Sequence, residues 1–323
     1  MTTGSFNYLA AGATPSLFRN GRVLIRRDRD GSDGDARGVD LERHLISLED
    51  GRQGPRGTLA GQGFELGRSP LCDPELDFLD HHAVVDVYYP ECEEILRAAT
   101  GARHVVAFDH NVRSVEGKRS SQRLAGGQEV QGPALVVHGD YTLTSGPQRL
   151  RDLASAPSEN DTYRDRLAPG ETLLGAEAVE AALAGGRFAL INVWRNIAHE
   201  PVAAQPLALC DARSLLPEDL VVLEIHYADR VGENYFARHA ESHRWVTYPA
   251  LTRDEVLLIK QWDSAGELAR SAGARSDGEA PDSTSTFSLH SAFVDPATPD
   301  DAPPRWSIEV RCVLLYDGEA RGA

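Results

Sequence analysis

The sequence lacks a long apolar segment and a surplus of basic residues. No apolar run approaches the ~20 residues that a helix needs to cross a bilayer, so no membrane span is expected. Residues 1–17 contain neither a basic segment nor an apolar core, so no signal peptide is expected. The 49 acidic residues outnumber the 33 basic ones, for a formal net charge of −16. Nucleic acids and anionic membranes are polyanions, so neither is expected to be a partner.

Cysteine is scarce and scattered. The four cysteines form no C-x-x-C pair and show no other zinc-binding spacing. This pattern favours reduced thiols in a cytoplasmic protein over a disulfide framework. With 323 residues, of which 41% are hydrophobic and 25% charged, the chain has the composition of a globular protein with a large core.

Short β-rich runs separated by turn residues dominate what is present. They predict strands at 22–25, 86–90, 104–110, 134–142, 188–194, 221–225, 243–248, 256–262, 286–293 and 306–315. Helical patterns are confined to 91–99, closed by Gly101, and to 148–186, chiefly 177–183. The sequence therefore predicts a mainly β protein with a barrel or jelly-roll architecture.

No internal repeat and no clear linker divides the chain, so a single domain over 1–323 is expected. It carries an N-terminal extension at about 1–85 and a helical insertion at about 148–186. Within the extension, residues 26–63 are rich in Asp, Arg and Gly. They are predicted to form a long surface loop with one short element at 41–48.

A His-Gly-Asp step follows the apolar run at 134–137. In a strand, His138 and Asp140 lie on one face and can share a metal ion. They are two thirds of the 2-His-1-carboxylate set of non-haem Fe(II) oxygenases. A lone His-x-Asp pair is more often ordinary polar structure, so a distant histidine has to complete the site. His290, in the alternating run 286–293, is the candidate, although alone it too is more often structural.

A carboxylate-binding pattern begins fifteen residues after His290. Alternation places Arg305, Ser307, Glu309 and Arg311 on one face of the predicted strand. An arginine can bind a carboxylate through two parallel hydrogen bonds, and a hydroxyl two residues on adds a third donor. The C5 carboxylate of 2-oxoglutarate needs such a site. The order His-x-Asp, late His and Arg-x-Ser therefore favours a metal site with a 2-oxoglutarate clamp.

These stretches resemble the AsaB-like hydroxylase/desaturase family, which includes the CmcJ-like non-haem iron oxygenases. The resemblance extends from about residue 104 to 315 and is carried by 108–113, 137–142, 192–195, 209–214, 254–260, 263–264, 290–296 and 307–311. It implies a double-stranded β-helix, or jelly roll, with flanking helices. It also implies Fe(II) and 2-oxoglutarate as cofactor and co-substrate, with His138, Asp140 and His290 as the metal ligands. Asn196 stands where the family usually has proline, and 235–245 conforms poorly, which leaves the substrate open.

Two arginines are candidates for binding the distal carboxylate of 2-oxoglutarate. Spacing from His290 favours Arg305, with Ser307 beside it, whereas the family-like ending Ser-Ile-Glu-Val-Arg favours Arg311. Arg311 could equally pair with Glu309 as structure. The candidates for substrate contact are Tyr141, Asn192, Trp194, Arg195, Arg113 and His110. The alternatives are core packing for Trp194, ion pairing for Arg195 and Arg113, and a hydrogen-bonded strand position for His110.

Three functions stay open at this point. The first is an Fe(II)/2-oxoglutarate-dependent dioxygenase that uses O2 to hydroxylate or desaturate a small molecule of natural-product biosynthesis. The second is a 2-oxoglutarate-independent non-haem iron oxidase, and the third is a non-catalytic partner subunit of a modifying enzyme. The complete set of two histidines and one aspartate argues against the third, since a subunit without catalysis does not need it. A homo-oligomer and a partner enzyme are both compatible with the sequence.

Overall fold

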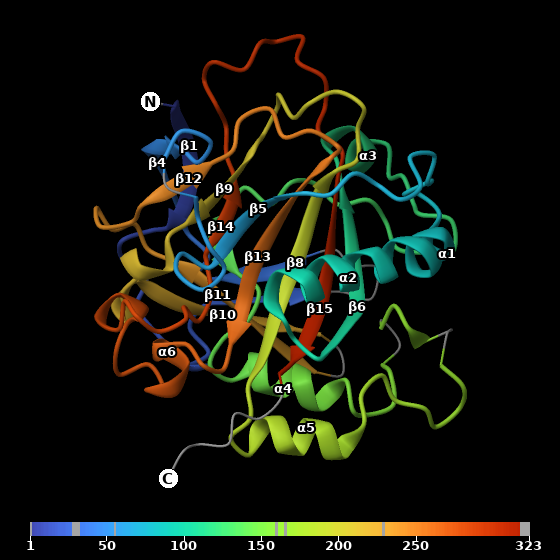
Figure 1. Ribbon diagram of the computed structural model, residues 1–323. Helices are drawn as coiled ribbons and strands as arrows, with labels where there is room; N and C mark the ends of the chain where they lie inside the picture. The colour runs from blue at the N-terminus through green and yellow to red at the C-terminus, as the bar shows by residue number, and fades with distance from the viewer. Residues whose placement is uncertain are drawn as a thin grey trace.

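The computed structural model describes residues 2–27, 33–54, 56–158, 161–164, 167–227 and 230–316. Within these ranges the strands form two sheets (Figure 1). The order in the ten-stranded sheet is β1 (Thr2–Leu9), β4 (Leu41–Asp50), β12 (Trp245–Thr247), β9 (Leu207–Cys210), β14 (His290–Ala292), β7 (His138–Gly139), β11 (Val231–Ala237), β10 (Leu220–His226), β2 (Leu24–Arg27) and β3 (Asp33–Arg37). The order in the five-stranded sheet is β5 (Phe64–Arg68), β13 (Glu255–Asp263), β8 (Phe188–Asn196), β15 (Ser307–Leu315) and β6 (His104–Arg113).

The helices are few and lie outside the sheets. They are α1 (His81–Ala83), α2 (Tyr89–Thr100), α3 (Val115–Arg119), α4 (Ser145–Asp152), α5 (Ala176–Leu183) and α6 (Glu267–Arg270). In Figure 1, α2 crosses the five-stranded sheet over β15 and β6, and α4 and α5 lie together at one end of it. None of the helices in the described ranges has the length and hydropathy of a membrane span.

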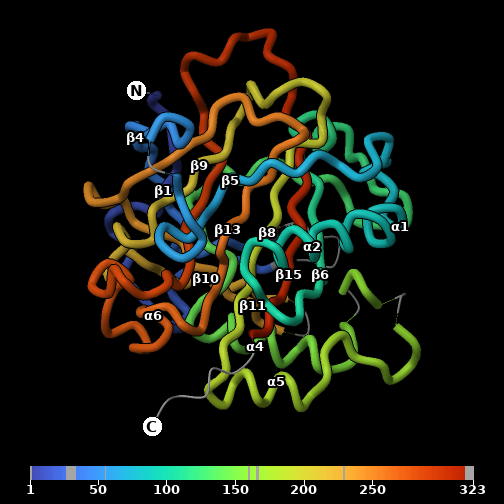
Figure 2. Tube along the Cα trace, in the orientation of Figure 1, coloured from blue at the N-terminus to red at the C-terminus, as the bar shows by residue number. Residues whose placement is uncertain are grey.

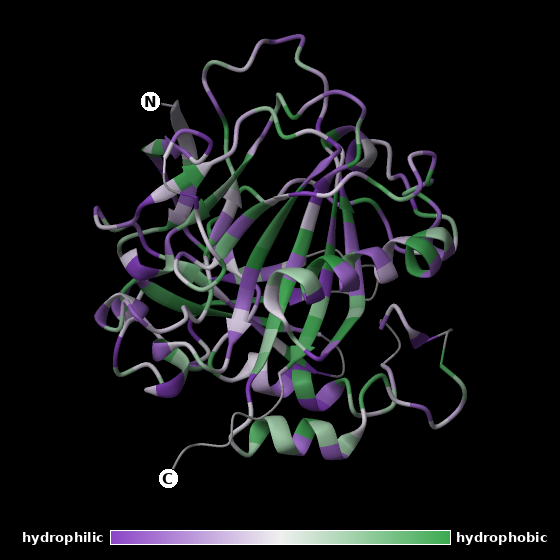
Figure 3. Ribbon diagram, in the orientation of Figure 1, coloured by the Kyte–Doolittle hydropathy of each residue, from purple (hydrophilic) through white to green (hydrophobic). Residues whose placement is uncertain are grey.

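The five-stranded sheet has an apolar outer face and an inner face that mixes polar and apolar side chains. Successive side chains of a strand point to opposite faces. On the outer face, side chains such as Ile191, Val193 and Val310 pack against Cys92 and Leu96 of α2. Figure 3 shows the central strands largely in the colour of hydrophobic residues. The inner face faces the ten-stranded sheet and carries Asn192, Trp194, Ser307, Glu309 and Arg311, which are all polar or aromatic.

Most of the predicted elements are present. Strands occur where the sequence predicted them at 104–110, 188–194, 221–225, 256–262 and 306–315, and helices at 91–99 and 177–183. Gly101 ends α2 in the left-handed conformation, with φ of 67°, which glycine adopts without steric cost. All nine residues of β8 are buried, as its near-continuous apolar sequence predicted.

Three local predictions were wrong. Residues 86–90 are helical and not extended, because Val84–Tyr88 forms a π-helical turn that leads into α2. Pro90 lies in the first turn of α2, directly after the π-helical turn, and does not stop the element. The predicted strand at 134–142 shrinks to the two residues of β7. The 26–63 stretch is less of a loop than predicted: the element expected at 41–48 is present as β4, and β3 also lies in the described part.

The first 85 residues contribute β1 to β5 to the two sheets. β1 pairs with β4 along its whole length, and β4 in turn pairs with β12 from the second half of the chain. Figure 2 shows these early segments, in blue, beside segments coloured yellow to red. Residues 148–186 hold α5 and most of α4, whose apolar side chains pack against the end of β8.

Candidate metal centre

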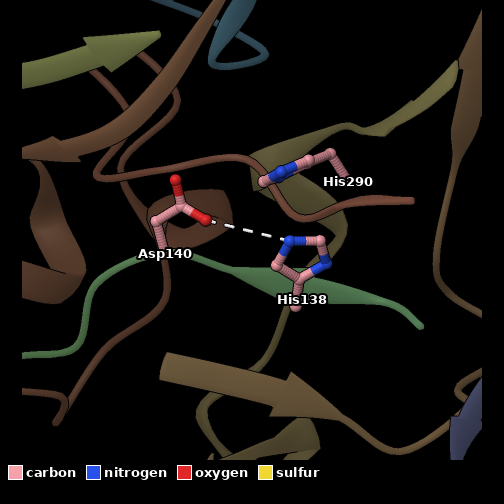
Figure 4. A group of neighbouring side chains, drawn as sticks. All are labelled: His138, Asp140 and His290. Carbon is pink, nitrogen blue, oxygen red and sulfur yellow. Dashed lines mark ion pairs between the residues drawn. The ribbon is translucent and has the colours of Figure 1, made fainter. Parts of the chain in front are cut away.

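His138, Asp140 and His290 converge although 150 residues separate Asp140 from His290. β7 and β14 are antiparallel neighbours, with His138 directly opposite His290, and Asp140 follows the end of β7. One ligand atom from each residue lies within 4.8 Å of the others. Nε2 of His138 is 3.8 Å from Oδ1 of Asp140, and the two imidazole centroids are 4.3 Å apart. Figure 4 shows the three side chains pointing toward one another.

Burial favours the neutral form of both imidazoles, and a hydrogen bond fixes the tautomer of His138. Nδ1 of His138 lies 2.8 Å from the carbonyl oxygen of Val136. Because a carbonyl only accepts, Nδ1 carries the proton and Nε2 keeps a free lone pair toward Asp140. Burial lowers the pKa of His138 to about 4 and also lowers the pKa of His290. Both side chains are therefore neutral near pH 7, as metal binding requires.

The Asp140 carboxylate is fixed through one of its two oxygens. Oδ2 accepts hydrogen bonds from Nδ2 of Asn192 (3.0 Å) and from Nε of Arg311 (3.2 Å). Oδ1 instead faces His138. Burial alone would raise the pKa of Asp140, but the Arg311 guanidinium and the two histidines hold it below its usual range. The group therefore offers one oxygen of an ionised carboxylate.

Gln261 joins the two sheets at this point. From β13, its Oε1 accepts the backbone N–H of Asp140 (3.0 Å), and its Nε2 lies 3.4 Å from Nδ1 of His290. The sequence patterns did not single out this residue. The feature of the sequence that could have identified Gln261 is a polar amide inside the apolar run 256–262. In the structure this side chain is completely buried.

Arg311 is fully engaged with carboxylates. Its Nη1 donates to Asp109 (2.8 Å) and its Nη2 to Glu309 (3.4 Å), in addition to the bond from Nε to Asp140. Burial would lower the pKa of Arg311, but these acidic groups raise it well above its usual value. Each of its three nitrogens therefore already meets a carboxylate, which makes this guanidinium a poor site for a further one. Asp109 was also missed at the sequence level, although it lies in the family-like stretch 108–113.

Arg305 has the opposite character. It is 5% exposed, and its Nη1 donates to the carbonyl of Gln205 (2.6 Å) above the ring of Trp194. Its Nε and the hydroxyl of Ser307 are both buried without a hydrogen-bond partner in the described structure. Burial, together with the nearby Arg113, lowers the pKa of Arg305 to about 9. A buried cation beside an unpaired hydroxyl is a site that an anion would stabilise.

Three of the candidates for substrate contact lie beside the three-residue group, and a fourth, Trp194, lies beneath Arg305. Asn192 bonds to Asp140, and Tyr141 follows Asp140 directly in the chain. Arg113 lies close enough to lower the pKa of His138, His290 and Arg305. Trp194 packs against Phe64 and Leu257 beneath Arg305. Burial raises the pKa of Tyr141 to about 12, so its hydroxyl is protonated at neutral pH.

The other two candidates lie on the outer face of the five-stranded sheet. Arg195 bonds to Tyr88 and Glu91 and to two backbone carbonyls. Nδ1 of His110 is 2.8 Å from the hydroxyl of Tyr89. Because adjacent strand residues point to opposite faces, the sheet separates both from Asp140. This placement corrects the interpretation of Arg195 and His110 as pocket residues: the alternatives, ion pairing and a hydrogen-bonded strand position, describe them.

Comparison with known proteins gives relatives over most of the chain. A family model described as an oxidoreductase/YMDC permease-like domain matches residues 18–315. The Fe(II)/2-oxoglutarate-dependent dioxygenase nvfI of Aspergillus novofumigatus is 31% identical over 278 residues, which covers 84% of this chain and 83% of the relative. The hydroxylase/desaturase efuI of Hormonema carpetanum is 27% identical over 281 residues, covering 82% of this chain and 80% of that one.

Two further matches add to this picture. An uncharacterized protein in the dcmA 3′ region of Methylophilus leisingeri is 41% identical over 192 residues, 59% of this chain and 88% of that protein. The solved structure of the iron and alpha-ketoglutarate-dependent endoperoxidase NvfI superposes with a TM-score of 0.71 at 22% identity, over 97% of each chain. This likeness confirms the predicted jelly-roll fold. The chain therefore belongs to the matched oxidoreductase family and, within it, to the AsaB- and CmcJ-like hydroxylase/desaturases that its sequence resembles.

Proposed function

We propose that this protein is an Fe(II)/2-oxoglutarate-dependent dioxygenase that hydroxylates or desaturates a small molecule of secondary metabolism. The observation that carries the proposal is the convergence of His138, Asp140 and His290 from β7, its end and β14. The activities for which the relatives nvfI and efuI are named support it. Fe(II) bound with 2-oxoglutarate and O2 would supply oxidative decarboxylation to succinate and CO2, coupled to oxidation of a substrate C–H bond.

The donor set suits Fe(II). Two neutral imidazoles and one carboxylate on the same side of an ion leave its remaining positions open for a co-substrate and O2. The two donors on Oδ2 of Asp140 favour binding through Oδ1 alone. The carbonyl of Val136 and the hydrogen bond from Asn192 would keep the ligands oriented. We therefore assign the three residues as the metal ligands.

Arg305 and Ser307 suit the distal carboxylate of 2-oxoglutarate. The unpartnered Nε of Arg305 and hydroxyl of Ser307 supply donors, and burial of the cation makes an anion favourable there. Arg311 is the weaker candidate, since each of its three nitrogens already meets a carboxylate, that of Asp140, Asp109 or Glu309. We therefore place the clamp at Arg305, and we give Arg311 the role of holding Asp140.

The substrate would lie on the inner face of the five-stranded sheet. Tyr141 offers a protonated hydroxyl next to Asp140, and Arg113 lies near both histidines and Arg305. Trp194 offers an apolar wall under Arg305. We propose these three as substrate or co-substrate contacts, and we take Asn192 as a positioning residue for Asp140 because its amide is used there.

Anaerobic titration with Fe(II), followed by 2-oxoglutarate, tests the proposal. We expect stoichiometric Fe(II) binding and then a weak visible metal-to-ligand charge-transfer band when 2-oxoglutarate is added. Iron binding without this band would favour a 2-oxoglutarate-independent iron oxidase. Failure to bind iron would overturn the enzyme assignment and leave a non-catalytic subunit as the remaining candidate.

Gln261→Leu is expected to weaken Fe(II) binding roughly 10-fold, the lower end of the effect of removing groups that orient metal ligands. Its amide is the contact that ties Asp140 on one sheet to β13 on the other. Gln148→Leu is the matched control, because Gln148 bonds to Asp152 on the exposed surface of α4. Anaerobic calorimetric titration measures both affinities, and equal values for the two variants would contradict the role given to Gln261.

We also propose that the protein acts in the cytoplasm. In the described structure all four cysteines are free, and three of them are buried, which supports a reducing compartment. A small-molecule substrate and O2 are the partners that the relatives imply. A homo-oligomer and a partner enzyme both stay predictions. Light scattering of the purified chain measures its oligomeric state.

A further inference from the structure

Asp109 connects the metal centre to the helical insertion. Its Oδ2 accepts from Nη1 of Arg311 (2.8 Å), and its Oδ1 accepts from the hydroxyl of Thr162 (2.7 Å). Thr162 lies in the described segment 161–164, between α4 and α5. Arg311 in turn donates through Nε to Oδ2 of Asp140. An unbroken series of hydrogen bonds therefore runs from the insertion to the carboxylate proposed to bind iron.

The segment that carries Thr162 is anchored on both sides of it. Oδ1 of Asp161 accepts from Nη2 of Arg149 on α4 at 2.9 Å, and Asp161 also bonds to the backbone N–H of Ser158. The ring of Tyr163 lies 5.8 Å from that of Tyr89 on α2. These contacts hold the Thr162 hydroxyl against β6, so its bond to Asp109 is a fixed feature of the packing.

We propose that Thr162, Asp109 and Arg311 form a positioning relay that fixes the orientation of the Asp140 carboxylate. The relay rests on the proposed function, since it acts on the assigned metal ligand. A guanidinium is planar, so fixing Nη1 on Asp109 also fixes the direction of Nε toward Asp140. Oδ2 is then held away from the metal, and Oδ1 alone is presented. Through Thr162, the insertion then influences the orientation of the assigned metal ligand.

The electrostatics point in the same direction. Asp109 and Glu309 share the positive charge of Arg311 with Asp140. Without the Asp109 charge, Arg311 would attract Asp140 more strongly, and the carboxylate would become a weaker ligand for a cation. Loss of Asp109 is therefore expected to weaken metal binding by misorientation and by charge. Loss of the Thr162 hydroxyl acts by orientation alone, because no charge changes.

Metal titration of the full chain tests the relay through the variants Asp109→Asn, Thr162→Val and their double. We expect Fe(II) affinity to fall roughly 10-fold in D109N and about threefold in T162V, within or below the range for groups that orient metal ligands. The double variant should equal D109N, because Thr162 acts through Asp109. The charge-transfer band with 2-oxoglutarate should shift in both single variants, which a purely structural role would not cause.

Thr172→Val is the matched control in the same insertion. The Thr172 hydroxyl donates to the carbonyl of Leu174, and neither residue belongs to the relay. Parental iron affinity in T162V, or effects of D109N and T162V that multiply in the double variant, would overturn the relay while the proposed function stands. If D109N fails to fold, the comparison of T162V with T172V decides alone. If the parent chain binds no iron, both the proposed function and the relay are overturned.

Discussion

Replacing His138 by alanine is expected to reduce Fe(II) affinity by more than about 100-fold, beyond the range found when only orienting groups are lost. His138 contributes its unprotonated Nε2, 3.8 Å from Oδ1 of Asp140 and across from His290. Without it, only one imidazole and one carboxylate remain, and two ligands hold a divalent ion weakly. Anaerobic titration monitored by calorimetry measures the loss. Thermal unfolding gives an independent readout, because a bound metal raises the unfolding midpoint and the variant should show no such rise.

His199→Ala is the control for this prediction. His199 is exposed, lies beyond the end of β8 and belongs to neither β7 nor β14. Its removal should leave both the affinity and the metal-dependent rise in midpoint unchanged. If His138→Ala binds Fe(II) as tightly as the parent chain, the ligands have been assigned to the wrong residues, even if the enzyme uses iron elsewhere.

The three metal ligands could be predicted because they lie in short sequence patterns that follow one another in a characteristic order. His138 and Asp140 keep a spacing of two, and this spacing places both side chains on one side although β7 is only two residues long. His290 lies in a short alternating run that does form a strand. The polar face of β15 was predicted for the same reason, since Ile308 and Val310 pack in the apolar core and Ser307, Glu309 and Arg311 do not.

The orienting roles of Gln261 and Arg311 could not be predicted, because both residues are brought to Asp140 from remote parts of the chain. Arg311 is 171 positions from Asp140, and Gln261 is 121 positions away. No periodicity encodes such pairs, since they depend on how two sheets face each other. The helical turn before α2 was missed for a related reason. Its sequence favours a strand locally, but burial of Tyr88 and Tyr89 under the five-stranded sheet decides its conformation.

The choice between the two arginines also needed the fold. Arg305 precedes β15 and Arg311 lies within it, and both fall on the same face by alternation. The sequence pattern alone therefore does not distinguish them. The two arginines differ in their contacts with acidic side chains. Asp109 comes from β6 and Asp140 from the end of β7, and both contact Arg311. Arg305 instead meets a carbonyl and an aromatic ring.

Arg305→Gln is therefore expected to raise the Kd for 2-oxoglutarate roughly 100-fold, which corresponds to about 3 kcal/mol for the loss of charged hydrogen bonds. Fe(II) affinity should stay within about twofold, since no assigned ligand contacts Arg305. Arg311→Gln should show the reverse pattern, with weaker Fe(II) binding and little change in the Kd for 2-oxoglutarate at saturating iron. Titration of the charge-transfer band with 2-oxoglutarate separates the two. The opposite assignment would follow if Arg311→Gln raised this Kd and Arg305→Gln did not.

The stability of Arg305→Gln provides a second, independent check on the clamp. A buried cation without a carboxylate partner costs free energy in the folded chain, and a neutral side chain removes that cost. Without 2-oxoglutarate, the variant is expected to unfold at the same temperature as the parent or a higher one. With 2-oxoglutarate and iron, the parent should gain stability and the variant should gain much less, because the bound anion would compensate the buried charge of Arg305. A variant that is destabilised under both conditions would instead indicate that Arg305 is kept for its packing on Trp194 and its bond to Gln205.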